Sequence, residues 1–220
     1  TIKKTALSQF DTNRKNGLIA MNLKEGDELI GIKQTSGTNN VIIVTKQGKC
    51  ICFSEDDVRP MGRIAGGVRA IKLEGDDEVV AMELVEPGQE LLVVTQKGFG
   101  KRTKVEDYKI QVRGGKGLLT YDKAKFKKTG ELVGAMAVDD EDEILLINSD
   151  GIIIRLAANE ISKLGRATQG VKIMNVGEDA NIIALAKVIK EDELTGEIQI
   201  EKEEKKTENK KNDEQEQMKF

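Results

Sequence analysis

The 220-residue sequence has no histidine, no tryptophan, only two cysteines and only two prolines. Without histidine, the chain cannot build a Ser-His-Asp or Cys-His catalytic arrangement, and it has no His-based metal site. Two cysteines alone do not supply the four ligands of a structural zinc site. We therefore predict no catalytic residue and no metal ligand in this chain.

Long apolar runs are also missing, so no transmembrane helix and no membrane partner are expected. The N-terminus lacks the layout of a signal peptide and begins at Thr1, which indicates a fragment of a longer protein. Cys50 and Cys52 are spaced to face the same side of one strand, which disfavours a disulfide between them. We interpret them as reduced core residues of a cytoplasmic, monomeric protein.

An excess of positive charge is missing as well. The net charge is −3, of which residues 190–220 contribute −4 from seven lysines and eleven acids. The other 189 residues hold 28 cations and 27 acids, a net charge of +1. Any affinity for a polyanion must therefore come from the segregation of charge.

Internal repeats of about 50 residues dominate the sequence. Each full repeat opens with an apolar run, a glycine-containing turn and a second strand. The predicted first and second strands are Val41–Thr45 with Lys49–Phe53, Leu91–Thr95 with Phe99–Thr103, and Ile144–Ile147 with Ile152–Leu156. The glycine of each turn permits the positive φ of a tight hairpin.

Two further strands complete each predicted repeat. A polar turn closed by one apolar residue follows the second strand; these residues are Phe10, Val58, Tyr108 and Ile161. Third strands are expected at Gly17–Leu23, Gly67–Leu73 and Gly170–Val176, and fourth strands at Glu28–Gln34, Glu78–Val85 and Asn181–Val188. Four strands per repeat with almost no helix predict an all-β, propeller-like domain.

The predicted domain covers residues 1–189. Its four blades span about 1–35, 41–85, 91–138 and 144–188, and the first is partial because its opening strand is missing. Residues 190–220 are dense in charge and poor in large apolar side chains, so we predict a disordered tail.

A basic, glycine-containing loop recurs before each third strand. The full copies are Arg63–Gly67, Gln111–Gly117 and Arg166–Gly170, and Arg14-Lys15-Asn16-Gly17 is a weaker one. Arginine offers a planar fork to phosphate, lysine a point charge, and glycine lets backbone N–H groups approach an anion. A loop of this kind on every blade predicts a series of contacts with a polyanion, although the glycines also suit the backbone where each third strand starts.

The loop Gln111-Val112-Arg113-Gly114-Gly115-Lys116-Gly117 matches six of seven positions of the gyrase A-box, and it departs at Val112, where the box has a cation. With Lys3–Phe10, Glu25–Gly31 and Asp57–Arg63, the chain resembles the C-terminal domain of the A subunit of bacterial DNA gyrase, a type IIA topoisomerase, over residues 1 to about 189. The resemblance implies a six-bladed β-pinwheel whose blades exchange strands. It also implies duplex DNA bent around a basic rim in support of ATP-dependent negative supercoiling.

Further expectations follow from this resemblance. The partners would be double-stranded DNA, the rest of the gyrase A subunit and the gyrase B subunit in an A2B2 holoenzyme. ATP and Mg²⁺ would be used by the holoenzyme, and no cofactor would bind this fragment. The catalytic tyrosine of the family lies outside the fragment, and Tyr108 and Tyr121 match no such site. The full-strength box belongs to the first blade of the family, so residues 111–117 are a degenerate copy.

The predicted DNA contacts are cations of the loops and of the strands beside them. They are Lys3, Lys4, Arg14, Lys15, Arg63, Arg69, Lys101, Arg102, Arg113, Lys116, Arg155 and Arg166. The acidic runs Asp76–Glu78 and Asp139–Glu143 lack the spacing of a calcium loop and are interpreted as solvated turns. Two other functions stay open: the equivalent domain of topoisomerase IV, and a propeller-like scaffold for protein interactions.

Overall fold

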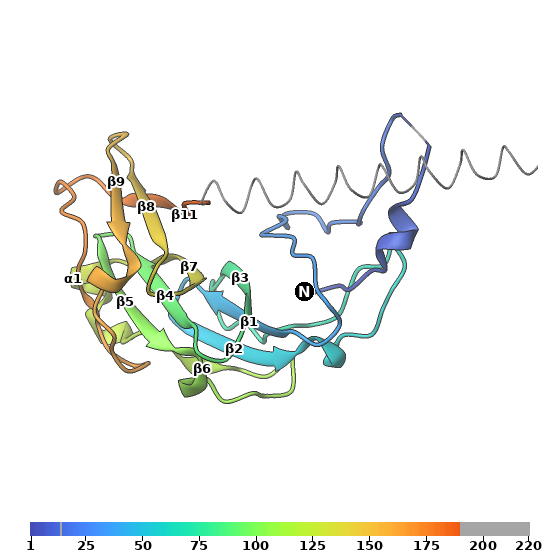
Figure 1. The fold of residues 1–220 in the computed structure, drawn as a ribbon, viewed down its shortest axis with the longest axis horizontal. Helices are drawn as coiled ribbons and strands as arrows, with labels where there is room; N and C mark the ends of the chain where they lie inside the picture. Colours follow the sequence, from blue (N-terminus) through green and yellow to red (C-terminus); the bar gives the residue numbers. More distant parts are fainter. Residues whose placement is uncertain (14, 190–220) are drawn as a thin grey trace, which may run out of the picture. The chain divides into compact units, whose positions relative to one another are not determined.

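The computed structural model describes residues 1–13 and 15–189, and its described elements are β-strands with five single-turn 3-10 helices and one short α-helix (Figure 1). Two units are distinguished, Thr1–Ala186 and Lys187–Phe220. The predicted tail at residues 190–220 lies outside the described residues.

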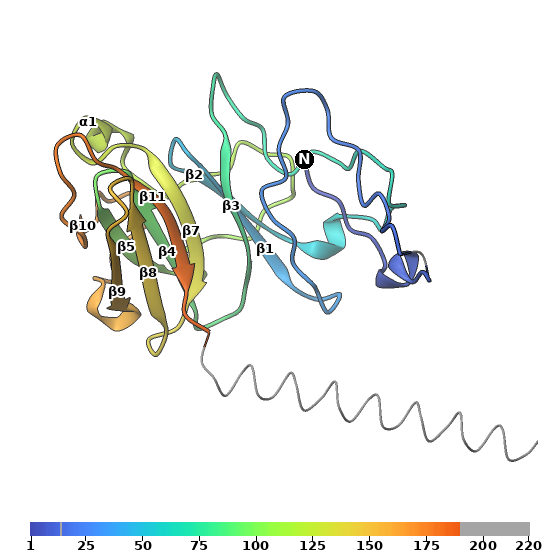
Figure 2. The ribbon, with the colours of Figure 1, turned by 90° about the horizontal axis from the view of Figure 1, so that it is seen from above.

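Three antiparallel sheets form the domain, as Figures 1 and 2 show. In order across each sheet, the strands are β3 (Val79–Val85), β1 (Asn40–Thr45), β2 (Lys49–Ser54) and β6 (Leu118–Leu119); then β10 (Val171–Lys172), β5 (Phe99–Lys104), β4 (Glu90–Thr95) and β7 (Leu132–Val138); then β11 (Ile182–Lys187), β8 (Glu143–Asn148) and β9 (Ile153–Ala157). The predicted first and second strands of the three full repeats are confirmed, as are the fourth strands β3 and β11.

Both four-stranded sheets are completed by residues of the following repeat. β6 pairs with Lys49 and Cys50 of β2, and β10 pairs with Phe99 and Gly100 of β5. In the same way, the backbone of Val68 exchanges two hydrogen bonds with Ile2. We call residues 60–69, 110–119 and 163–172 the exchanged segments. The last two border the second strands β2 and β5 of the preceding repeats, and the first borders residues 2–4.

The first predicted blade is corrected by the structure. Residues 1–35 contain the single-turn helix Leu7–Phe10 but no extended strand among the described residues, and the expected strand Glu28–Gln34 is exposed. In the other repeats the fourth strand pairs with a first strand, as β3 does with β1. Residues 1–35 contain no first strand, so residues 28–34 have no partner with which to form a ladder.

The predicted third strands are largely corrected by the structure. Residues 17–23 form no strand, residues 67–73 form only the isolated bridge between Val68 and Ile2, and residues 170–176 form β10, with two residues. The repeat for which no third strand was predicted has β6, also with two residues. Both strands are short because the chain then leaves the strand edge to cover the hairpin turn of the preceding blade. Thr120 N, for example, donates to the carbonyl oxygen of Gly48 at 2.8 Å in the β1–β2 turn.

Hydrophobic packing between neighbouring sheets explains the continuous apolar runs of β1 and β4. Ile42 and Val44 face one cluster of buried side chains, whereas Val41 and Ile43 face another. A strand that is buried on both faces carries apolar residues at every position. β3 and β7, each at one edge of its own sheet, lie side by side where the first two sheets meet (Figure 2).

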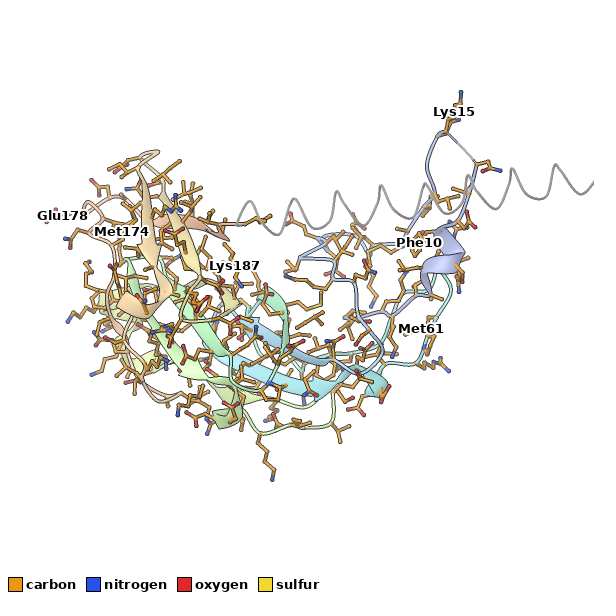
Figure 3. The ribbon with its side chains drawn as sticks, in the orientation of Figure 1. Phe10, Lys15, Met61, Met174, Glu178 and Lys187 are labelled. Carbon is orange, nitrogen blue, oxygen red and sulfur yellow. The ribbon has the colours of Figure 1, made fainter. Side chains whose placement is uncertain are left out.

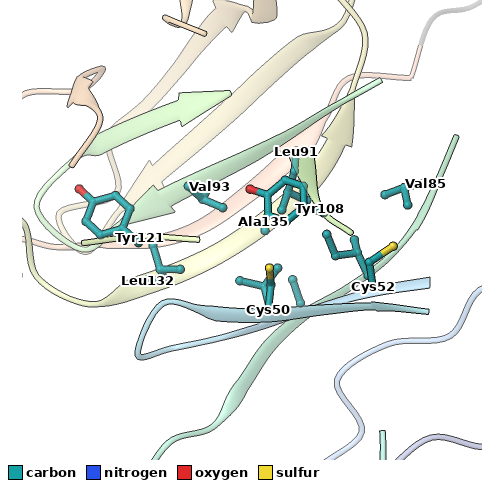
Figure 4. Close-up of a cluster of buried hydrophobic side chains, with 12 residues drawn as sticks. Cys50, Cys52, Val85, Leu91, Val93, Tyr108, Tyr121, Leu132 and Ala135 are labelled. Atoms are coloured by element: carbon teal, nitrogen blue, oxygen red, sulfur yellow. The ribbon is translucent and has the colours of Figure 1, made fainter. Parts of the chain in front are cut away.

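The central cluster contains both cysteines and both tyrosines (Figure 4). Cys50 and Cys52 are free thiols, as predicted, and burial raises their pKa values to about 12 and about 11. The hydroxyl groups of Tyr108 and Thr120 are 2.7 Å apart. Of the apolar residues that close the polar turns, Val58, Tyr108 and Ile161 are buried, whereas Phe10 is only half-buried.

Candidate nucleic-acid interface

The glycine of each exchanged segment allows its backbone to lie close to the backbone of the preceding repeat. Gly67, Gly117 and Gly170 have φ values of 79°, 71° and 80°. A Cβ atom on them would lie 2.6 Å from Ile2 O, 2.3 Å from Cys50 O and 2.7 Å from Gly100 O, respectively. Only glycine fits such an approach without strain, so these three glycines serve the strand exchange.

Lys3, in the N-terminal segment that the exchanged segment 60–69 borders, holds the 63–67 loop. Lys3 Nζ donates to the carbonyl oxygens of Ala20, at 2.6 Å, and of Arg63. Desolvation, together with the charge of Arg63, lowers the pKa of Lys3. The guanidinium of Arg63 donates to Ile19 O at 3.0 Å. Both cations are therefore engaged within the protein, although the Arg63 side chain stays partly exposed.

Lys101 holds the 166–170 loop in the same manner. Its Nζ donates to Gly165 O at 2.7 Å and to Arg166 O, and it lies 5.8 Å from the ring centroid of Tyr121. Burial lowers the pKa of Lys101 to about 8. The predicted DNA contact at Lys101 is wrong for this structure, since the residue is fully buried.

Arg102 is also buried, which corrects the second predicted contact on this strand. Its guanidinium donates to Ile161 O at 2.9 Å, to Glu90 at 2.6 Å and to Asp140 at 2.5 Å. Lys163 joins the network through Glu90 at 2.6 Å and Asp140 at 3.1 Å. Hydrogen bonds from Arg102 and Lys163 lower the pKa of Asp140. Arg102 and Glu90 are buried whereas Asp140 and Lys163 are exposed, and the two cations of the network are matched by its two carboxylates.

The 111–117 loop is held differently, because Ile51 occupies the place that Lys101 has on its own strand. Here Arg113 supplies the hydrogen bonds, from Nε to Asp57 O at 2.8 Å and from Nη1 to Arg69 O at 3.0 Å. The Gly114 N–H donates to Ala70 O at 2.6 Å. The arginine fork and one backbone donor expected for phosphate are thus used inside the domain.

Lys116 and Val112 are the outward-facing side chains of this loop. The Lys116 side chain is 66% exposed and forms an ion pair with Glu74 at 3.0 Å. Hydrogen bonds from Lys49 and Lys116 lower the pKa of Glu74 to about 2. Val112 is 77% exposed, and Gln111 is half-buried at the start of the loop.

The remaining predicted cations lie in different surroundings. Arg69 is exposed and Arg166 partly exposed on the exchanged segments. Lys15 projects from its loop (Figure 3), whereas Arg14 lies outside the described residues. Lys4 is half-buried and donates to Glu55 O at 3.0 Å. Arg155 occupies the place of Arg102, yet it is exposed and paired with Glu143, which raises its pKa.

The sequence analysis did not predict Lys172 or the four lysines of residues 123–128 as DNA contacts. Lys172, in β10, is exposed two residues after Gly170, as Arg69 is after Gly67. Aligning Gly-Val-Lys at 170–172 with Gly-Val-Arg at 67–69 would have found it. Residues 123–128, Lys-Ala-Lys-Phe-Lys-Lys, hold four exposed lysines. Within residues 1–13 and 15–189, no group of three or more acidic or cysteine side chains is placed to hold a metal ion, and no helix is long and apolar enough to cross a membrane.

The family model described as DNA gyrase C-terminal domain, beta-propeller, matches residues 1–36, 39–86, 89–139 and 142–189. The chain belongs to this family. It is 44% identical to the DNA gyrase A subunit of Mycolicibacterium smegmatis over 201 residues, which cover 90% of this chain and 23% of that protein. The chain thus spans about a quarter of the length of the relatives it matches.

Solved structures agree with this membership in the gyrase C-terminal domain family. The C-terminal domain of DNA topoisomerase IV has a TM-score of 0.81 at 26% identity, covering 87% of this chain and 59% of that one. The DNA gyrase A C-terminal domain has a TM-score of 0.73 at 30% identity, covering 80% and 59%. The all-β propeller or pinwheel fold is thereby confirmed.

Proposed function

We propose that this gyrase C-terminal domain binds duplex DNA through its exchanged segments and bends it, in support of ATP-dependent negative supercoiling by a gyrase holoenzyme. One observation carries the proposal. Each exchanged segment presents an exposed cation within two residues of its glycine: Arg69, Lys116 and Lys172. Because these segments recur on successive repeats, the cations form a series along which the phosphate backbone of a curved duplex runs.

Contacts of this kind are made to the DNA backbone. Lysine and arginine on phosphates fix the position of a duplex without distinguishing its bases. Preference among sequences then arises from the cost of bending, which flexible steps lower. The other cations of the loops, Arg63 and Arg113, support the backbone that carries the contacts. The holoenzyme of the proposal also contains the rest of the gyrase A subunit and the gyrase B subunit, and it uses ATP and Mg²⁺. The DNA contacts proposed for this domain do not involve them.

Salt dependence tests the proposal directly. Binding of a duplex of about 40 bp should weaken steeply as salt rises, since each neutralised phosphate releases counterions. The triple variant Arg69→Gln/Lys116→Gln/Lys172→Gln should flatten the plot of log K against log salt by about 0.9 for each phosphate that is no longer neutralised. A matched variant, Lys24→Gln/Lys104→Gln/Lys109→Gln, removes the same charge from other exposed lysines and should keep most of the slope. Equal slopes in the two variants would sink the proposal and favour a protein-interaction scaffold.

Decatenation as in topoisomerase IV is the second candidate, favoured by the TM-score of 0.81. A holoenzyme that carries this domain would distinguish the two. Gyrase function predicts negative supercoiling of relaxed plasmid, and this activity should fall in the triple variant. Decatenation without supercoiling would support the second candidate.

A further inference from the structure

The connection between β6 and β7 has the opposite charge from its counterparts. Residues 123–128 carry four lysines, on the single-turn helix Lys123–Lys125 and on α1 (Phe126–Thr129). The equivalent connections are acidic in the neighbouring repeats, with Glu74, Asp76, Asp77 and Glu78 in one and Glu178 and Asp179 in the other. We call residues 123–128 the lysine turn.

Local contacts fix the backbone of the lysine turn. The side chain of Asp122 accepts from Ala124 N at 3.0 Å, and Gly130, at a φ of 69°, ends α1 with a hydrogen bond from its N–H to Phe126 O. Phe126 stacks on Tyr121 with the ring centroids 5.9 Å apart. One aromatic side chain thus attaches the turn to the core, while the four lysines stay exposed.

The lysine turn reaches from one blade to the next and meets an exchanged segment. Lys123 Nζ donates to Gln47 Oε1 at 2.9 Å on the β1–β2 turn. Lys128 Nζ lies 5.4 Å from the ring centroid of Phe99, and Lys172 Nζ lies 4.8 Å from the same centroid. Two cations therefore share one ring, and the turn continues the basic surface at Lys172.

This concentration of charge is not compensated within the described part of the domain. Four like charges within six residues of sequence repel one another. No carboxylate of residues 1–13 or 15–189 lies within 4.0 Å of the ammonium groups of Lys125, Lys127 or Lys128. A turn with this charge is suited to an external polyanion.

We propose that the lysine turn is an additional contact for the phosphate backbone of duplex DNA. It extends the contact made at Lys172, which lies over the same Phe99 ring as Lys128. The inference rests on the proposed DNA-binding function and extends it beyond the exchanged segments. Lys125, Lys127 and Lys128 act as point charges on phosphates and read no bases. The equivalent connections on the neighbouring repeats carry carboxylates in place of these lysines, so the proposal concerns the β6–β7 connection.

The test compares two charge-matched variants of the 220-residue chain. Lys125→Gln/Lys127→Gln removes two cations of the lysine turn, whereas Lys24→Gln/Lys104→Gln removes two exposed lysines elsewhere. Binding of a duplex of about 40 bp is measured over a salt series. The slope for the first variant should fall by about 0.9 for each of its two phosphate contacts, and the control should match the wild type. Circular dichroism should show both variants folded, since all four side chains are exposed.

The outcomes separate this inference from the function on which it rests. If the two variants have the same slope and affinity while the wild type remains salt-sensitive, the lysine turn does not bind DNA and the exchanged segments still do. If wild-type binding is itself insensitive to salt, the proposed function is wrong. If the first variant keeps its DNA affinity but no longer binds poly-glutamate, the surface recognises an acidic protein and the DNA contact is overturned.

Discussion

Arg113 donates a hydrogen bond from Nε to the carbonyl oxygen of Asp57 at 2.8 Å, across the boundary between two repeats. Its Nη1 reaches Arg69 O at 3.0 Å, so one guanidinium links two carbonyl groups of the preceding repeat. In this box motif, the arginine supports the loop and Lys116 carries the exposed charge. Substitution of Arg113 should therefore affect the stability of the domain, and substitution of Lys116 its affinity for DNA.

The first prediction separates stability from binding. Arg113→Lys should lower the free energy of unfolding by about 0.5–1.5 kcal/mol, because the lysine lacks the rigid, planar pair of donors, Nε and Nη1, that reaches the carbonyl oxygens of Asp57 and Arg69. Lys116→Gln should leave the stability unchanged and lower the DNA affinity. Urea unfolding and duplex binding at fixed salt check both. A destabilised Lys116→Gln, or an Arg113→Lys that is as stable as the wild type, would contradict this division.

The second prediction concerns the position at which the box departs from its pattern. Val112 is 77% exposed on the 111–117 loop, so a long cationic side chain fits there without displacing the core. Val112→Arg should tighten DNA binding and steepen the salt dependence by about 0.9 for one added phosphate contact. Val112→Gln adds a polar side chain without charge and serves as the control. If both variants bind alike, position 112 does not face the DNA.

The third prediction compares two equivalent arginines. Arg102 and Arg155 occupy the same place in successive second strands, but only Arg102 is covered by the next exchanged segment. Arg102→Ala should destabilise the protein by about 3–5 kcal/mol, because it leaves Glu90 buried without its guanidinium. Arg155→Ala should change the stability far less, since its pairing with Glu143 is exposed. Thermal unfolding of the two variants measures the difference, and similar losses of stability would show that the covering segment does not matter.

Much of the fold could be predicted from local patterns. The runs 41–45 and 91–95 were recognisable because both faces of these strands are buried, and the hairpins because a glycine follows each run. The burial of Arg102 could not be found in this way, since its partners Glu90 and Asp140 come from other strands and turns. Cations in the strand Phe99–Lys104 look the same in the sequence whether solvent or the next repeat covers them. The lysine turn was missed because it repeats nowhere in the chain.

The last prediction follows from the lowered pKa of Lys101. Burial lowers this pKa from 10.5 to about 8, so between these values the unfolded chain binds more protons than the folded chain. The contribution of Lys101 to stability therefore rises with pH across this window and is constant below it. Cys50 and Cys52 act in the opposite direction, because their raised pKa values make the folded state retain protons as the pH rises above 9.

The variant Lys101→Met tests the contribution of the lysine, because the wild type and the variant both contain Cys50 and Cys52. Free energies of unfolding should be measured in urea from pH 7 to pH 10. The wild-type value minus the variant value should increase with pH above about 8, even though the variant also lacks the hydrogen bonds to Gly165 O and Arg166 O at every pH. Lys24→Met, at an exposed site, should give a constant difference. A wild-type value that falls relative to Lys101→Met over this range would mean that the ammonium is stabilised by its carbonyl partners more than burial opposes it, and the direction of the pKa shift would be wrong.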